Sequence, residues 1–190
     1  MDGRARRDTR IGPAIDRSLI DRARNGDLDA FESIVNARMD AVYRLTSAIL
    51  GNEADARDAA QETFVAAWRQ MAALREPERF DAWLQRVAVN AARQTHRARS
   101  RRRVREIPSS TVSTLADRRA GSPPDDAAIL DSALARLPVE QRAILVLHHL
   151  EGRPVTELAT ILDIPEGTAK SRLFTARRAL AAAIAADEAR

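Results

Sequence analysis

The chain has 190 residues, a formal net charge of +4, only 4% aromatic residues and no cysteine. A chain without cysteine forms no disulfides and no thiolate metal sites, and no apolar run reaches the length of a membrane span or a signal-peptide core. These properties predict a soluble, cytoplasmic protein without membrane insertion, large enough for one mid-sized domain or two small ones.

Four helices are predicted in the first half of the chain. Residues 1–16 are Arg-rich and without periodicity, which predicts a disordered leader. The helices are expected at residues 18–24, from the capping Asp27 to Leu50, at 53–73, and from Phe80 past Arg97. Their inward residues are Phe31, Ile34, Val35, Val42, Leu45 and Ile49 on the second helix and Ala60, Phe64, Ala67 and Trp68 on the third. Residues 17–98 therefore read as one compact helical domain, with residues 74–79 as a loop.

The second half begins with a segment that lacks any sustained period. Residues 99–126 combine an Arg run with Pro, Ser and Gly, which predicts a flexible linker. Apolar periodicity resumes near Ile129, and Pro138 starts a further helix before the last two. The chain is thus expected to be all-α, with a second small domain at residues 127–190.

A helix-turn-helix is the most specific local pattern in the chain. Val155, Leu158, Ala159 and Leu162 mark the apolar face of a short helix, which the sequence Asp163-Ile164-Pro165 interrupts. In the helix that follows, Ala169, Leu173, Ala176 and Leu180 recur at steps of four, three and four and should face inward. The residues left on its other faces suit the major groove of DNA, where Arg or Lys reads guanine edges and Ser or Thr holds phosphate.

Two further faces of opposite charge lie on the third and fourth predicted helices. Asp55, Asp58 and Glu62 are spaced three and four apart, so they share one side of a helix. Arg86, Asn90, Arg93 and Arg97 share one side of the next helix, and residues 93–105 contain seven Arg and no acid. A basic helix end with an Asn suits phosphate contact together with hydrogen bonding to base edges. We expect these faces to serve two partners on two surfaces, and we expect Phe80 and Trp83 to be core residues.

Several motifs occur in an order that resembles a known family. They are residues 52–64 (NEADARDAAQETF), 80–90 (FDAWLQRVAVN), 134–142 (LARLPVEQR), 151–153 (EGR) and 167–173 (GTAKSRL). Together they resemble the extracytoplasmic-function (ECF) sigma factors, the group IV members of the sigma-70 family of bacterial RNA polymerase. The resemblance covers about residues 18–97 and 127–182, and it implies that these two parts are sigma regions 2 and 4.

The resemblance also implies partners and roles for particular residues. The partners are core RNA polymerase, double-stranded promoter DNA, its non-template single strand and, as is common in the family, an anti-sigma factor, with no cofactor and no metal. Asp55, Asp58, Gln61 and Glu62 match the helix that docks on the polymerase clamp. The loop at 74–79 with Arg79, and the helix face with Arg86, Asn90, Arg93 and Arg97, match the part that holds the minus-ten element. Arg153, Thr168, Lys170, Ser171, Arg172, Phe174 and Arg177 match the reader of the minus-thirty-five element.

Two departures from the family pattern are visible. Ala169 stands where the family commonly has Val, and the loop at 74–79 carries Pro77 but no aromatic residue. An extruded base is normally held by aromatic stacking, so the loop leaves open which residues hold it.

Two other functions remain open at this level. A transcription regulator that is not a polymerase subunit would share the helix-turn-helix but would need a sensing domain, which the first half does not offer. A metal-dependent enzyme using His148 and His149 is the remote alternative, because neighbouring His residues point to different helix faces and lack the i, i+4 metal spacing. We therefore expect no enzymatic activity.

Overall fold

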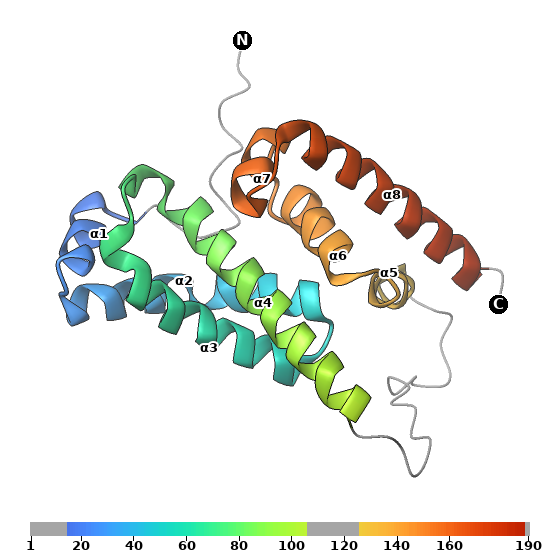
Figure 1. Ribbon diagram of the computed structural model, residues 1–190, viewed down its shortest axis with the longest axis horizontal. Coiled ribbons are helices and arrows are strands. Elements are labelled where there is room, and N and C mark those ends of the chain that lie inside the picture. The colour runs from blue at the N-terminus through green and yellow to red at the C-terminus, as the bar shows by residue number, and fades with distance from the viewer. Residues whose placement is uncertain (1–14, 106–125, 189–190) are drawn as a thin grey trace.

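The computed structural model describes residues 15–105 and 126–188, and every regular element in these two ranges is helical (Figure 1). The first range, here called the first unit, holds α1 (Arg17–Arg24), α2 (Leu28–Leu50), α3 (Glu53–Gln70) and α4 (Phe80–Arg105). The second range, the second unit, holds α5 (Asp126–Ala135), α6 (Val139–Leu145), α7 (Val155–Leu162) and α8 (Glu166–Glu188). The all-α fold predicted from the sequence is confirmed. No helix in the described ranges is long and apolar enough to span a membrane.

The helix starts of the first unit follow from side-chain caps. The Asp16 carboxylate accepts from the N–H of Ser18, so Asp16, the last residue of the expected leader, is the N-cap of α1. The Asp27 carboxylate accepts from the N–H of Ala30 at 3.0 Å, and the Asn52 side chain accepts from the N–H of Asp55 at 2.9 Å. Each bond satisfies a backbone donor that the first helical turn leaves without a partner.

Gly51 ends α2 in the left-handed conformation, with φ of 63°. Glycine adopts this conformation without the steric cost that a Cβ brings. The reversal lets α3 run back along α2, so the caps and this glycine together set the hairpin on which the acidic face lies.

The core of the first unit lies between α2, α3 and α4. Ile34, Leu45, Ile49, Phe64 and Val89 are buried there. Truncating a buried Leu such as Leu45 to Ala typically costs about 2–5 kcal/mol. Phe31, Val35 and Trp68 were expected to point inward but are only half-buried at the edge of α2 and α3, where the rings of Phe31 and Trp68 lie 4.9 Å apart.

A buried charge joins α2 to α4. The Arg38 side chain has no exposed surface, and its Nε donates to the Asp81 carboxylate at 2.8 Å. Because a buried guanidinium requires partners, this pair fixes the start of α4 against the middle of α2.

Three elements differ from the sequence expectation. α4 continues to Arg105, so residues 99–105, which were expected to belong to the linker, are helical. Residues 99–105 contain neither Gly nor Pro, and Arg favours helix. The loop at 74–79 holds a 3-10 turn at Pro77–Arg79, and α3 tightens into another at Met71–Ala73.

The second unit packs its last helix across the other three. Leu147, Leu158 and Ile161 are buried beneath α8 together with its Ala169 and Leu173. The inward face predicted for α8 is confirmed at Ala169, Leu173 and Ala176, whereas Leu180 is half-buried. α6 continues into a π-helical turn at Val146–Leu150 before the chain enters α7.

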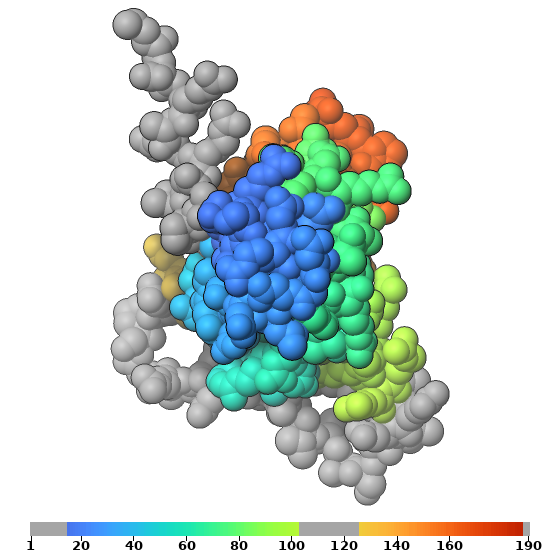
Figure 2. Space-filling view, turned by 90° about the vertical axis from the view of Figure 1, so that its left-hand side faces the viewer, coloured from blue at the N-terminus to red at the C-terminus, as the bar shows by residue number. Residues whose placement is uncertain are grey.

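The two units pack against each other and share one apolar core. α6 and α7 lie beside α4, as Figure 1 shows, and α6 also contacts α2. In Figure 2 the orange atoms of α7 lie against the green start of α4. The Arg142 side chain of α6 is 5% exposed and donates to the Leu50 carbonyl oxygen at the end of α2. The units are therefore not independent bodies in this structure.

Candidate polymerase and nucleic-acid interfaces

The acidic face of α3 is open to solvent except at its first member. Asp58, Gln61 and Glu62 are exposed, whereas Asp55 is half-buried and its carboxylate is paired with Arg99 of α4. The Asn52 cap forms, and the Asp55 carboxylate is paired with Arg99.

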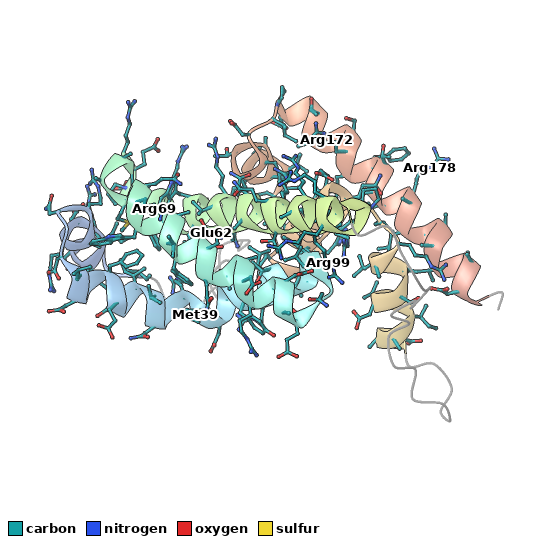
Figure 3. All side chains as sticks on the ribbon, turned by 60° about the horizontal axis from the view of Figure 1, so that its bottom comes forward. Met39, Glu62, Arg69, Arg99, Arg172 and Arg178 are labelled. Atoms are coloured by element: carbon teal, nitrogen blue, oxygen red, sulfur yellow. The ribbon has the colours of Figure 1, made fainter. Side chains whose placement is uncertain are left out.

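The acidic face and the basic end of α4 are neighbours and not two separate surfaces. Asp58 and Glu62 line one hollow together with Arg97 and Arg101. In Figure 3, Glu62 on α3 and Arg99 on α4 lie along this seam between the two helices. The antiparallel packing of α3 on α4 brings the acidic start of one helix beside the basic end of the other, which spacing along single helices does not reveal.

A second hollow lies farther toward the start of α4. It is lined by Glu62, Arg69, Trp83, Arg86, Asn90 and Gln94, among others. Asn90 is exposed, and Trp83 is half-buried with its ring 5.7 Å from that of Phe80. The expectation of core packing holds for Phe80, which is 3% exposed. For Trp83 the expectation holds only in part, because its half-buried indole also lines this hollow.

The Arg residues expected on the minus-ten face are in different environments. Arg79 is exposed and pairs with Glu76 at 2.9 Å. Arg97 borders the hollow beside Asp58. Arg86 points to the second unit, where its guanidinium pairs with Asp163 at 2.8 Å.

Arg93 is half-buried between the two units. Burial lowers the pKa of Arg93, and the nearby Arg172 and Arg97 charges act in the same direction while the Glu140 carboxylate opposes them. Two cations expected to contact different promoter elements, Arg93 and Arg172, are therefore close enough to repel each other.

The helix-turn-helix predicted from the sequence is present. Asp163 adopts φ of 56°, and the N–H of Ile164 donates to the Ala159 carbonyl oxygen at 3.0 Å, which closes the end of α7. Asp tolerates the left-handed conformation better than most residues. Pro165 then precedes α8, whose outer face is exposed.

The residues of α8 expected to read DNA mostly point to solvent. Lys170, Ser171, Arg172, Phe174 and Arg177 are exposed, and Thr168 is half-buried. Several already have partners: Lys170 pairs with Glu166 at 2.8 Å, the Ser171 hydroxyl donates to the Thr168 carbonyl, and the Arg178 guanidinium lies 5.9 Å from the Phe174 ring centre. Arg172 and Arg178 project from α8 in Figure 3.

Arg153 is held inside the protein and does not face solvent as a phosphate contact would. Its side chain is 17% exposed, its Nε donates to Gln85 of α4 at 2.8 Å, and its Nη1 pairs with Glu157 at 2.9 Å. Gln85 is buried and also donates to Glu151 at 3.0 Å. Residue spacing did not reveal the bond between Arg153 and Gln85, because the two residues are 68 positions apart in the sequence.

The two neighbouring His residues do not diverge as expected. Their rings lie 4.8 Å apart, edge to face, because the π-helical turn changes the spacing of side chains around the helix. Nδ1 of His148 lies 2.8 Å from the Arg153 carbonyl oxygen, which requires the N–H of that tautomer. His149 accepts from Nε of Arg177 at 3.2 Å. Within the described ranges, no three His, Cys, Asp or Glu side chains are grouped to hold a metal ion.

Comparisons with known proteins agree with this geometry. The family described as Sigma-70 region 2 matches residues 34–102, and the family described as Sigma-70, region 4 matches residues 127–180. The ECF RNA polymerase sigma factor SigW of Bacillus subtilis is 30% identical over 86% of this chain and 94% of SigW. The ECF RNA polymerase sigma factor SigM of Mycobacterium tuberculosis is 34% identical over 82% of this chain and 78% of SigM. Among solved structures, CnrH in complex with the cytosolic domain of CnrY matches with a TM-score of 0.65 and 28% identity, over 90% of this chain and 98% of the matched chain.

Proposed function

This chain belongs to the ECF sigma factors, which direct RNA polymerase to promoters, and we propose which of its surfaces bind polymerase and which bind DNA. The observation that carries the assignment is the pairing of α3 and α4. Two hollows lie between these helices: Asp58 and Glu62 of α3 face guanidinium groups of α4 in the first, and Glu62 faces the indole of Trp83 and the amide of Asn90 in the second. The proposal assigns no catalytic step to this chain.

The polymerase contact is assigned to Asp58, Gln61 and Glu62. All three are exposed on one stretch of α3, and the two carboxylates suit a basic partner surface. Asp55 was expected to bind polymerase with these three residues, but its carboxylate is paired with Arg99. We assign Asp55 to holding the end of α4 in place beside the docking face.

The minus-ten contact is assigned to the hollow with Trp83 and Asn90. A half-buried indole offers the flat apolar surface on which an extruded base can stack. Asn90 carries both a donor and an acceptor for the base edge. Trp83 thereby supplies the aromatic surface that the loop at 74–79 lacks, while Arg79, Arg86, Arg93 and Arg97 supply positive charge for the phosphates.

The minus-thirty-five contact is assigned to the exposed face of α8. Lys170 and Arg172 lie near its start, where a recognition helix meets base edges. Thr168, Ser171 and Arg177 suit phosphate oxygens, and exposed Phe174 suits the methyl group of thymine. Arg153 joins this surface only when its contacts with Gln85 are released.

We keep the division into two domains but move the end of the first domain from residue 98 to residue 105, where α4 ends. We assign polymerase and minus-ten binding to residues 17–105 and minus-thirty-five binding to residues 126–190, while residues 1–14 and 106–125 lie outside the described ranges. Each part alone would bind promoter DNA weakly, and tethering both to polymerase raises their effective concentration at the promoter. As CnrH was solved with a second protein, CnrY, we extend to this chain the expectation of an inhibitory anti-sigma partner in the cytoplasm.

Run-off transcription tests this proposal. Core polymerase is incubated with fragments of the source genome, with and without the purified chain. We expect discrete transcripts only when the chain is present, each starting downstream of a shared pair of short sequence elements. Core polymerase that gives the same transcripts without the chain, or no transcripts with it, would contradict the proposal.

A further inference from the structure

The segment between α3 and α4 is anchored in the core at every third residue. Its buried anchors are Met71, Leu74, Pro77 and Phe80. The residues between these anchors are exposed. A 3-10 helix has three residues per turn, so the 3-10 turns at Met71–Ala73 and Pro77–Arg79 place the anchors on one side. The segment thus has a fixed side toward the core and an exposed side.

α1 covers one flank of this segment. In Figure 1, α1 lies beside the connection from α3 to α4, and it contacts both 3-10 turns. Ile20 and Ala23 of α1 are buried in the same apolar cluster as Met71 and Leu74. The anchored segment therefore packs against α1 as well as against its own unit's core.

An ion pair, here called the α1 brace, ties α1 to the second 3-10 turn. The Arg17 guanidinium lies 2.5 Å from the Glu78 carboxylate, although the two residues are 61 positions apart. Successive residues of a 3-10 turn point about 120° apart. Because Pro77 is buried and Glu78 is held by α1, Arg79 is left on the outer side of the turn, where it pairs with Glu76.

The chain is also held just after Arg79. The buried Arg38 of α2 binds Asp81 in the first turn of α4. Arg79 therefore lies between two held residues, Glu78 on one side and Asp81 on the other. The backbone that carries the Arg79 side chain is fixed from both directions.

We propose that Arg17 is a positioning residue for minus-ten binding: by holding Glu78, it sets the direction in which Arg79 meets the phosphates of the DNA strand. This inference rests on the proposed function, which assigns Arg79 to those phosphates. It gives a part in promoter binding to α1, none of whose residues is assigned to DNA or to polymerase.

The benefit of the α1 brace is entropic. A turn that is fixed before binding loses less conformational freedom when its Arg side chain binds a phosphate. Arg17 and Glu78 are 67% and 59% exposed, and exposed ion pairs are individually weak. Loss of the α1 brace should therefore weaken binding of the strand by a factor of about two to five.

A direct effect of the two charges on DNA has a different signature. Removing the Arg17 charge would weaken DNA binding, whereas removing the Glu78 charge would strengthen it. Removing both would then change the affinity little. Positioning predicts instead that the loss of either residue weakens binding, and that a neutral link between the two positions restores it.

A covalent link in place of the ion pair tests this difference. Arg17→Cys is combined with Glu78→Cys, and a short bis-methanethiosulfonate joins the two thiols before core polymerase is added. The chain has no Cys of its own, so only the introduced pair reacts. The link is reducible and restores neither charge. The measured quantity is the affinity of core polymerase with each variant for the fluorescent non-template strand of a promoter found by run-off transcription.

We expect the double variant to bind the strand about two- to five-fold more weakly than the unsubstituted chain does. The crosslinked protein should regain the original affinity, and reduction should bring the loss back. Affinity for core polymerase and circular dichroism should be unchanged throughout, which a general loss of structure would not allow.

Arg57→Cys with Glu53→Cys is the matched control. These residues form another exposed ion pair, at 2.8 Å on α3, roughly 20 Å along that helix from its last turn. This variant should bind the strand normally with and without the crosslinker.

The effect should also depend on Arg79. Arg79→Ala alone should weaken strand binding, and adding the two Cys substitutions of the α1 brace should weaken it no further, because the brace acts through this side chain. Additive losses would contradict that dependence.

Three further results would overturn the inference. They are a folded double variant that does not crosslink, an uncrosslinked double variant that binds as tightly as the unsubstituted chain, and a crosslinked one that regains no affinity. If the unsubstituted chain with core polymerase binds no promoter strand and starts no transcript, the proposed function fails, and the inference fails with it.

Discussion

The guanidinium of Arg142 donates to the carbonyl oxygen of Leu50 at 3.2 Å, although the two residues are 92 positions apart. The bond satisfies an acceptor at the end of α2, where the last turn of a helix leaves carbonyl groups without helical partners. It also places a cation at the negative end of the helix dipole. One side chain of the second unit thus completes a helix of the first.

Replacing Arg142 by Ala should lower the free energy of unfolding of the whole chain by about 1–3 kcal/mol, because a buried acceptor loses its donor. Urea unfolding followed by circular dichroism measures the change. Arg102→Ala, at the exposed end of α4, is the control and should change the free energy little. Equal unfolding midpoints for both variants would show that the Arg142 contact does not stabilise the fold.

Stability should fall as the pH decreases below about 6.5. Burial lowers the pKa of His149, and the nearby His148 and Arg177 lower it further. The unfolded chain therefore binds a proton at a higher pH than the folded chain does. The contribution of His149 to stability is complete above the unfolded pKa and is lost as the pH falls toward the folded pKa.

Melting temperatures measured between pH 5 and pH 7.5 check this direction. In His149→Gln the dependence of the melting temperature on pH should be smaller than in the unsubstituted chain. A pH dependence that His149→Gln leaves unaltered would exclude His149 as its source.

The helix pattern was predictable because its signals are local. Asp27, Asn52 and Gly51 act within a few residues of their own positions, so the ends of α2 and the start of α3 could be predicted. The continuation of α4 past residue 98 was missed, because a run of Arg suggests a linker as readily as a charged helix. The buried position of Arg142 was missed because its partner belongs to another unit.

Trp83 and Asn90 should have distinguishable effects on minus-ten binding. Trp83→Ala should weaken binding of the single strand by about 1–3 kcal/mol across sequences, because every base has a face that can stack. Asn90→Ala should instead change the preference for one base, because an amide reads base edges.

Binding of the chain with core polymerase to fluorescent promoter DNA, over a set of single-base changes, measures both effects. Arg97→Ala serves as a comparison, since loss of a phosphate contact should reduce the salt dependence of binding by about one ion. If both Trp83→Ala and Asn90→Ala lowered the affinity equally for every promoter sequence, Asn90 would not be a residue that reads a base.

Lys170 and Arg172 should also differ, because two positions apart on a helix they are about 200° apart. Arg172 is the residue we expect to read a base, since its planar group can pair with guanine at two points. Arg172→Ala should cost about 1–3 kcal/mol at one position of the minus-thirty-five element. Lys170→Ala should weaken all sequences alike. Selection from a library of promoter duplexes by the chain bound to core polymerase measures both effects. A base-specific loss in Lys170→Ala with a uniform loss in Arg172→Ala would show that Lys170 reads the base and Arg172 does not.

The candidate sites were predictable to the extent that they depend on one helix. Exposure of Asp58, Glu62 and Arg172 follows from helical spacing and is present in the structure. The half-buried Trp83 and the internal position of Arg153 depend on how helices from different parts of the chain pack, which spacing does not encode.

The affinity of the chain for core polymerase is the most direct test of its role as a sigma factor with a docking face on α3. Asp58→Arg with Glu62→Arg reverses two exposed charges of this face, and Glu32→Arg with Asp40→Arg makes the same change on exposed positions of α2. We predict that the α3 variant binds core polymerase at least ten-fold more weakly while its circular dichroism stays that of the unsubstituted chain, and that the α2 variant binds normally. Equal affinity of the two variants would contradict the account.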